Sequence, residues 1–204
     1  PEPDGFLIIG SNRLARAIAK SLLEFDIRVI IADSSREGIA KAEAADIPVY
    51  RGNPLSQHAT YTLRLDGFGT LLALSARESE SVAAIFHYRK EFGKNKIYAL
   101  LPTSAAKSSK TPVKRRAMPQ LHGKTLFSDK VGYQQLLQRI ESGATVRRIS
   151  LEDTFDANEF HKNYGQEAVP LFGIDPKNRA HCFSTDDLLQ TGKGWTIIYL
   201  GTAG

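Results

Sequence analysis

Residues 6–15 have the sequence Phe6-Leu-Ile-Ile-Gly-Ser-Asn-Arg-Leu-Ala15, an apolar run that ends in glycine and leads into a helical pattern. In α/β proteins, a strand that is followed by a glycine turn and a helix presents backbone N–H groups to phosphate at the N-terminus of the helix. Asp33 closes the next apolar run about 20 residues on, where a carboxylate can accept a hydrogen bond from a ribose hydroxyl. Asn12 and Ala15 replace two glycines of the usual phosphate loop. The stretch therefore predicts a nucleotide pocket with an altered phosphate contact.

The first half of the chain alternates apolar runs with amphipathic stretches, as expected for strands that alternate with helices. Strands are expected over residues 6–10, 28–33, 48–52, 70–75 and 96–101, and helices over 12–26, 35–46, 55–65 and 78–92. Strands that are apolar throughout are typical of a parallel sheet with both faces covered. We therefore predict an α/β fold for residues 5–102, with a Rossmann-like doubly wound parallel sheet.

The second half of the chain has a different pattern. Residues 103–120 are rich in Ser, Lys and Pro and poor in large apolar side chains, which predicts a basic linker. Beyond it, strands are expected over 124–127, 145–151, 169–174, 180–183 and 195–200, and helices over 131–142 and 154–164. Short strands separated by turn residues predict a small α+β domain with an antiparallel sheet over residues 121–204.

The composition is that of a globular protein with a basic charge balance. The chain has 204 residues, 42% of them apolar, and a net charge of +5. No run approaches the roughly 18 apolar residues of a membrane span, and the N-terminus lacks the pattern of a signal peptide. Cys182 is the only cysteine, which excludes an intrachain disulfide and fits a reducing cytosol.

Five basic residues gather in the predicted linker with no acidic residue among them: Lys107, Lys110, Lys114, Arg115 and Arg116. A solvated linker is the simplest interpretation. A segment that lies near an anionic membrane surface, which attracts Lys and Arg, is the alternative. Nucleic acid is not an expected partner, because the cluster has no interleaved aromatic residues and no recognition motif.

Polar residues or glycines follow each of the first four predicted strands, at the edge where open α/β sheets bind their ligands. In this arrangement residues 11–14 supply a helix N-terminus for an anion, Arg13 adds charge, and Asn53 and Ser75 line the base or sugar. Each position alone is better explained by an ordinary turn or helix cap, but the four strand ends together favour a site. The candidate nucleotide contacts are Gly10, Ser11, Asn12, Arg13, Leu14, Asp33, Ser34, Gly52, Asn53 and Ser75.

No catalytic or metal-binding residue is predicted. His161 lies in a polar helix and is expected at the surface, and His181 beside Cys182 lacks the partners of a metal cluster. The sequence contains no P-loop, zinc-ligand spacing or nucleophile elbow. A soluble NAD(P)-dependent oxidoreductase is the enzyme alternative, and it requires a catalytic acid or a Lys/His pair at the pocket.

Several motifs together resemble the RCK (regulator of potassium conductance) domain, also called the KTN or Trk-N domain. They are Gly10-x-x-x-Leu14-Ala15, Asp33, Tyr50-Arg-Gly-Asn-Pro-Leu55, and Leu71-Leu-Ala-Leu-Ser75 followed by Arg77-Glu-Ser-Glu80. Residues 50–56 are most similar to the version found at the cytosolic C-terminal end of bacterial cation:proton antiporters. Pro170-Leu-Phe-Gly173 and Gly194-Trp-Thr-Ile-Ile-Tyr-Leu200 look like the small domain that follows RCK modules.

The resemblance implies regulation rather than catalysis. Domains of this family bind adenine nucleotides (AMP, ADP or ATP) or NAD(H) and couple the binding to a membrane channel or transporter. The implied partners are a second copy in a homodimer and an N-terminal transmembrane domain of the same protein, at the cytoplasmic face of the cell membrane. The implied activity of the whole protein is sodium/proton or potassium/proton antiport. By position, the ligand contacts fall on Gly10, Asn12, Leu14, Asp33, Gly52, Asn53 and Ser75.

A scaffold or dimerisation domain with a degenerate pocket is the alternative to a nucleotide sensor, because Asn12 and Ala15 depart from the glycine pattern. A ligand shifts a two-state equilibrium only by its different affinity for the two states. The predicted linker, residues 103–120, is the expected moving element between the two domains.

Overall fold

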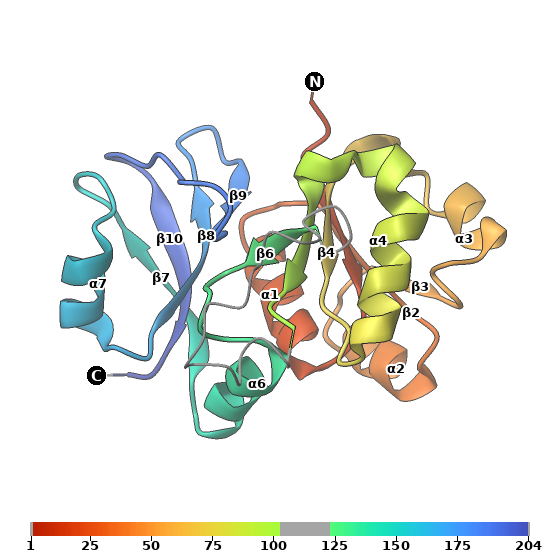
Figure 1. The fold of residues 1–204 in the computed structure, drawn as a ribbon, viewed down its shortest axis with the longest axis horizontal. Coiled ribbons are helices and arrows are strands. Elements are labelled where there is room, and N and C mark those ends of the chain that lie inside the picture. Colours follow the sequence, from red (N-terminus) through yellow and green to blue (C-terminus); the bar gives the residue numbers. More distant parts are fainter. Residues whose placement is uncertain (1, 103–122, 204) are drawn as a thin grey trace.

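The computed structural model describes residues 2–102 and 123–203, which form two sheets side by side (Figure 1). The larger sheet has six parallel strands in the order β3-β2-β1-β4-β5-β6. The chain order reverses between β1 and β4, so their carboxyl ends form the switch point of a doubly wound sheet. The strands are β1 (Gly5–Ile9), β2 (Val29–Asp33), β3 (Val49–Arg51), β4 (Phe68–Ala73), β5 (Ile97–Leu100) and β6 (Lys124–Leu126).

Local signals set the limits of the helices between these strands. The side chains of Asn12, Ser35 and Ser56 each accept a hydrogen bond from the first turn of the helix that follows. The fourth helix has the predicted bounds and ends at Gly93. The first is shorter than predicted, because its chain turns at Asp26 with a φ of 57°. These helices are α1 (Arg13–Leu23), α2 (Arg36–Ala44), α3 (Gln57–Thr62) and α4 (Glu78–Phe92).

Helices cover both faces of the parallel sheet. The apolar side chains of α1, such as Leu14 and Ile18, join the core on one face together with Ala42 of α2. Those of α3 and α4, such as Ile85, join the core on the opposite face. The predicted Rossmann-like class is confirmed. None of the helices in the described ranges is long and apolar enough to span a membrane.

The smaller sheet is antiparallel, as predicted, with the order β7-β10-β8-β9. Its strands are β7 (Thr145–Ser150), β8 (Val169–Ile174), β9 (Ala180–Cys182) and β10 (Thr196–Gly201). Helix α7 (Ala157–Tyr164) begins at the capping residue Asp156 and packs Phe160 against Tyr199 of β10. Helix α6 (Tyr133–Glu141) lies against α1 of the larger unit.

Strand β6 corrects one prediction about the second half. Residues 124–127 were expected in the antiparallel sheet, but Lys124–Leu126 pair with β5 and extend the parallel sheet. A run of three residues carries no signal for its partner, since strand pairing is set by tertiary packing. The division into a domain over 5–102, a linker over 103–120 and a domain over 121–204 stays a prediction. The linker and its basic cluster lie outside the described residues.

The two sheets share one core. Phe172 of β8 is fully buried and lies edge-on to Phe6 of β1, with ring centroids 6.0 Å apart. Phe127, just after β6, contacts the same ring at 5.8 Å. Apolar side chains of both sheets and of α1 form a single cluster. The small sheet therefore occupies the same face of the parallel sheet as α1, in the place that a further helix takes in a symmetric doubly wound fold.

Residues 184–187 cover the outer edge of β6. Ser184 forms an antiparallel bridge with Leu126, and the Thr185 N–H donates to the Thr125 carbonyl at 3.2 Å. The Asp186 carboxylate accepts from the Thr125 N–H at 2.7 Å, and Asp187 pairs with Lys124. Unpaired strand edges invite pairing with other chains, so this segment protects the sheet.

Candidate functional site

The carboxyl ends of β1 to β4 meet at the switch point, as the sequence predicts. Gly10 follows β1 and lies directly against Ser75, which follows β4. On the other side of β1, the Gly52 N–H donates to the Asp33 carbonyl at 3.0 Å and joins the ends of β2 and β3. The predicted positions Gly10, Asp33, Gly52 and Ser75 therefore share one edge of the sheet.

Gly10 has a conformation and surroundings that exclude a side chain. Its φ is +102°, and a Cβ atom built on it would lie 2.8 Å from the Ser75 Cα atom. An L-residue rarely adopts this backbone conformation, and the close neighbour is backbone that cannot rotate away. The first glycine of the fingerprint is thus required by the turn between β1 and α1.

The Asp33 carboxylate holds the turn together. Its Oδ2 accepts from the Ser11 N–H at 2.7 Å, and its Oδ1 accepts from the Ser35 N–H at 3.0 Å. The residue is only 9% exposed. Each carboxylate oxygen has a second lone pair, so these bonds leave capacity for a ribose hydroxyl. Asp33 therefore fixes the start of α1 and α2, a role that the sequence does not predict.

Asn12 uses its whole side chain where the usual fingerprint has glycine. The Oδ1 atom accepts from the Ala15 N–H at 2.9 Å and caps α1, while Nδ2 donates to the Leu74 carbonyl at 2.7 Å. The side chain thereby bridges the crevice between β1 and β4. An α-helix leaves its first four N–H groups without internal acceptors, and the cap satisfies one of them. The N–H groups of Asn12, Arg13 and Leu14 remain at the positive end of the helix dipole.

A surface cavity of about 410 Å³ opens beside this turn, between the ends of β2 and β3 and the start of α4. Ser34 and Asn53, both predicted contacts, line it directly. Its lining residues are Ser34, Asn53, Pro54, Leu55, Arg77, Ser79 and Glu80. A second cavity of about 210 Å³ is lined by Ser75 and extends to Pro102 and Tyr133. Of the ten predicted contacts, Ser34 and Asn53 line the first cavity and Ser75 lines the second.

Arg77 and Glu80 belong to the cavity but were not predicted contacts. The Arg77 guanidinium pairs with Glu80 at 3.1 Å, and Glu80 also accepts from the Ser75 hydroxyl at 3.1 Å. The signal was present in the sequence, as a basic residue between the end of a strand and the start of a helix. An anionic ligand could exchange with Glu80 for this guanidinium, because the Arg77 side chain is 76% exposed.

Leu14 and Arg13 differ in which of their groups a ligand could contact. The Leu14 side chain is fully buried in the core, so only its N–H group faces the turn. The Arg13 side chain is exposed. Arg16, which was not predicted, reaches back along α1 and donates to the Ser11 carbonyl at 3.1 Å. Burial lowers the pKa of Arg16, and the electrostatic effect of Tyr133 of α6 partly opposes this shift. Arg16 thus connects α1 to the turn that precedes it.

A hydrogen bond from α4 stabilises the loop after β3. The Asn53 Oδ1 atom accepts from the Leu55 N–H at 2.9 Å, and the Tyr88 hydroxyl donates to the Pro54 carbonyl. Tyr88 is fully buried, and burial raises its pKa to about 12, so the hydroxyl is a donor throughout the neutral range.

Replacing Tyr88 by phenylalanine is expected to lower the free energy of unfolding by about 1 kcal/mol, because the Pro54 carbonyl loses its partner. The measurement is urea denaturation followed by circular dichroism. Tyr61→Phe is the matched control, since Tyr61 is 83% exposed and its hydroxyl removal should leave stability unchanged. Equal stability of the Tyr88 variant and the native chain would contradict the assigned role.

The His181 side chain contacts other residues of the small sheet and its loops. His181 Nε2 lies 2.9 Å from Asp175 Oδ2, and its ring packs at a tilt of 37° against Trp195, with ring centroids 5.2 Å apart. Burial raises the pKa of the Cys182 thiol. Within residues 2–102 and 123–203, no cluster of three His, Cys, Asp or Glu side chains is placed to hold a metal ion.

A doubly wound sheet with polar groups at its switch point defines a Rossmann-like domain of the nucleotide-binding type. Residues 6–109 match the family model of the TrkA-N domain, and the chain belongs to that family. The resemblance to RCK/Trk-N domains found in the sequence is therefore confirmed.

Three solved structures show the range of similar proteins. The TrkA-N domain of the inner membrane protein ybaL from Escherichia coli is 18% identical, with a TM-score of 0.42 over 48% of this chain and 72% of that one. The GsuK RCK domain is 17% identical, with a TM-score of 0.48 over 100% of this chain and 45% of that one. The GsuK channel bound to NAD is 18% identical, with a TM-score of 0.47 over 100% and 37%. No curated protein matches the chain at a significant level.

Proposed function

We propose that this chain is the cytosolic regulatory domain of a membrane cation transporter, with an adenine nucleotide or dinucleotide as its ligand. Membership of the TrkA-N domain family supports the regulatory class. The observation that carries the proposal is that the predicted strand ends share one edge of the sheet, where Ser34 and Asn53 line a cavity of about 410 Å³. Attachment to an N-terminal antiporter domain, a homodimeric state and a position at the cytoplasmic face of the membrane are parts of the same proposal.

In the proposed complex the adenosine part lies in the cavity beside Ser34 and Asn53. The ribose hydroxyls donate to the Asp33 carboxylate, whose two oxygens each accept one hydrogen bond within the chain and can accept another. The phosphates lie between the N-terminus of α1 and the Arg77 guanidinium, both of which favour negative charge. A dinucleotide would extend past Ser75 into the second cavity, so the bridge from Asn12 to Leu74 stands in its path.

Binding would regulate transport through a difference in affinity between two states of the whole protein. A ligand shifts such an equilibrium only by that difference, and coupling between sites is typically about 1–3 kcal/mol. Arg16 offers a physical route, since it donates to the Ser11 carbonyl and belongs to α1, which packs against α6.

The second candidate is a scaffold whose pocket no longer binds a ligand. Asn12 and Asp33 favour it, because the groups expected to meet the phosphate and the ribose already bond within the chain. The two candidates differ in one measurable property, which is nucleotide affinity.

Calorimetric titration with AMP, ADP, ATP, NAD and NADH tests the proposal. Saturable binding of at least one nucleotide is expected. Replacing Arg77 by glutamine should weaken the binding of ADP about fivefold, as an exposed charge-assisted bond is lost. Lys90→Gln removes the same charge at the far end of α4 and is the control, with unchanged affinity expected. Absence of binding by all five ligands at millimolar concentration would establish the scaffold instead.

A further inference from the structure

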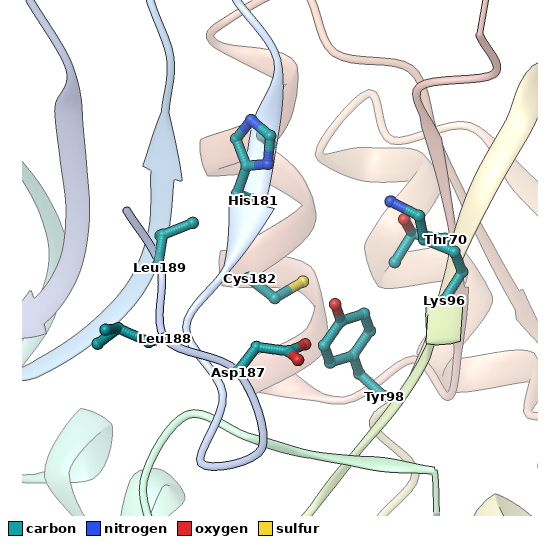
Figure 2. A pocket seen from close by; sticks show the side chains of 9 residues that line it. Thr70, Lys96, Tyr98, His181, Cys182, Asp187, Leu188 and Leu189 are labelled. Carbon is teal, nitrogen blue, oxygen red and sulfur yellow. The ribbon is translucent and has the colours of Figure 1, made fainter. Parts of the chain in front are cut away.

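A separate cavity of about 150 Å³ lies in the seam between the two sheets (Figure 2). One wall comes from Thr70 of β4 and from Lys96 and Tyr98 at the start of β5. The facing wall comes from β9 and the segment after it, with Cys182 and Asp187. The amino ends of β4 and β5 point to this cavity, so it lies at the opposite edge of the sheet from the candidate nucleotide site. Both sheets contribute side chains to it.

Polar groups converge on this space. Figure 2 shows the Tyr98 hydroxyl and the Cys182 thiol directed toward each other across the cavity, with the Lys96 ammonium beside Thr70. Lys96 belongs to the short 3₁₀ helix η2 (Lys94–Lys96), which sets its side chain at the mouth of the cavity. The hydroxyl, thiol and ammonium groups can all donate hydrogen bonds.

Lys96 and Asp187 both line the cavity, and of these two only Asp187 has an ion-pair partner among the described residues. The Asp187 carboxylate is paired with Lys124, and the His181 ring is paired with Asp175 at 2.9 Å. The neighbouring Asp186 carboxylate accepts from the Thr125 N–H. Among the residues that the structure describes, no carboxylate forms an ion pair with Lys96. An incoming anion would therefore meet an ammonium group whose charge is not already matched.

Burial favours the protonated forms of the other two groups. It raises the pKa of both Tyr98 and Cys182 above their ordinary values. Both therefore carry their hydrogen at neutral pH and act as donors, not as competing negative charges. The cavity holds about five water volumes, which is room for one small group and not for a nucleotide.

We propose that this cavity binds a small oxyanion, a carboxylate or phosphate group, held by the Lys96 ammonium and by the hydroxyls of Thr70 and Tyr98. The ligand contacts both sheets at once. Its binding stabilises their packing against each other, independently of whether a nucleotide occupies the other edge.

An NMR titration of the amide spectrum tests this site with sodium phosphate, sodium acetate and sodium chloride at equal ionic strength. Saturable shifts at the amides of Thr70, Lys96 and Cys182 are expected with phosphate or acetate and not with chloride. A response to acetate identifies the carboxylate class, and a response to phosphate alone identifies a more highly charged anion.

Lys96→Gln should weaken this binding about tenfold or more, because it removes the lysine charge that no described carboxylate pairs with. Lys94→Gln is the matched control in the same 3₁₀ helix, with unchanged affinity expected. The amide spectrum of each variant also reports that it is folded. Absence of saturable shifts in the native chain, an equal response to chloride, or equal losses in the two variants would each overturn the proposal.

Discussion

Replacing Gly10 by alanine is expected to lower the free energy of unfolding by about 3 kcal/mol or more and to abolish nucleotide binding. The added methyl group would lie 2.8 Å from the Ser75 Cα atom and 2.9 Å from its nitrogen, so β1 and β4 must separate at the switch point. The same residue needs a φ of +102°, which strains any L side chain. Urea denaturation measures the stability, and calorimetry with the best nucleotide measures the binding.

Gly143→Ala separates the two causes of this effect. Gly143 has a φ of +104°, and a Cβ atom there would meet no atom of the described chain within 4 Å. Its replacement therefore carries the conformational strain without the overlap, and about 1 kcal/mol is expected. If the two variants lost equal stability, the close approach of β1 and β4 would not be what requires glycine at position 10.

Phe172→Ala is expected to remove about 3–5 kcal/mol from the free energy of unfolding and to destabilise both sheets together. The ring is fully buried and contacts Phe6 at 6.0 Å and Phe127 at 5.8 Å, so its loss opens a cavity between the two sheets. Two probes follow the two units during denaturation. Trp195 is the only tryptophan and reports the small sheet, while circular dichroism mainly reports the helices around the parallel sheet.

Coincident transitions by the two probes are expected in the native chain and in the variant, because one core serves both sheets. Phe160→Ala is the comparison. Phe160 is equally buried but lies in a separate cluster with Tyr199, under α7. Its loss should reduce stability without involving the seam. Two separate transitions in the native chain would contradict the shared core.

Much of the parallel sheet could be predicted because its signals are local. Asn12 and Ser35 cap the helices that follow them, and Gly93 ends α4 where the sequence places it. Four strand ends carry glycine or polar residues, and parallel strands bring such ends to one edge. The sequence therefore indicated the place of the candidate site before any contact was known.

Contacts between distant parts of the chain could not be predicted in the same way. The sequence of Lys124–Leu126 does not indicate that it pairs with β5. The sequence around Phe172 does not indicate that its ring contacts Phe6. The bonds from Asp33 to Ser11 and from Asn12 to Leu74 depend on how closely the strands approach. The sequence indicates that Asp33 and Asn12 are polar residues near the ends of strands. Whether their side chains bind a ligand or hydrogen-bond within the chain depends on the tertiary packing.

The order of strands in the small sheet has a consequence for protein synthesis. Strand β10 lies between β7 and β8, although residues 196–201 leave the ribosome after both of them. Until β10 is synthesised, β7 and β8 lack the strand that pairs with both of them. The part of the core that contains Phe172 is then not covered by a complete sheet. We therefore expect nascent chains shorter than this to depend on chaperones, and the parallel sheet to reach its final packing only after residue 201 has emerged.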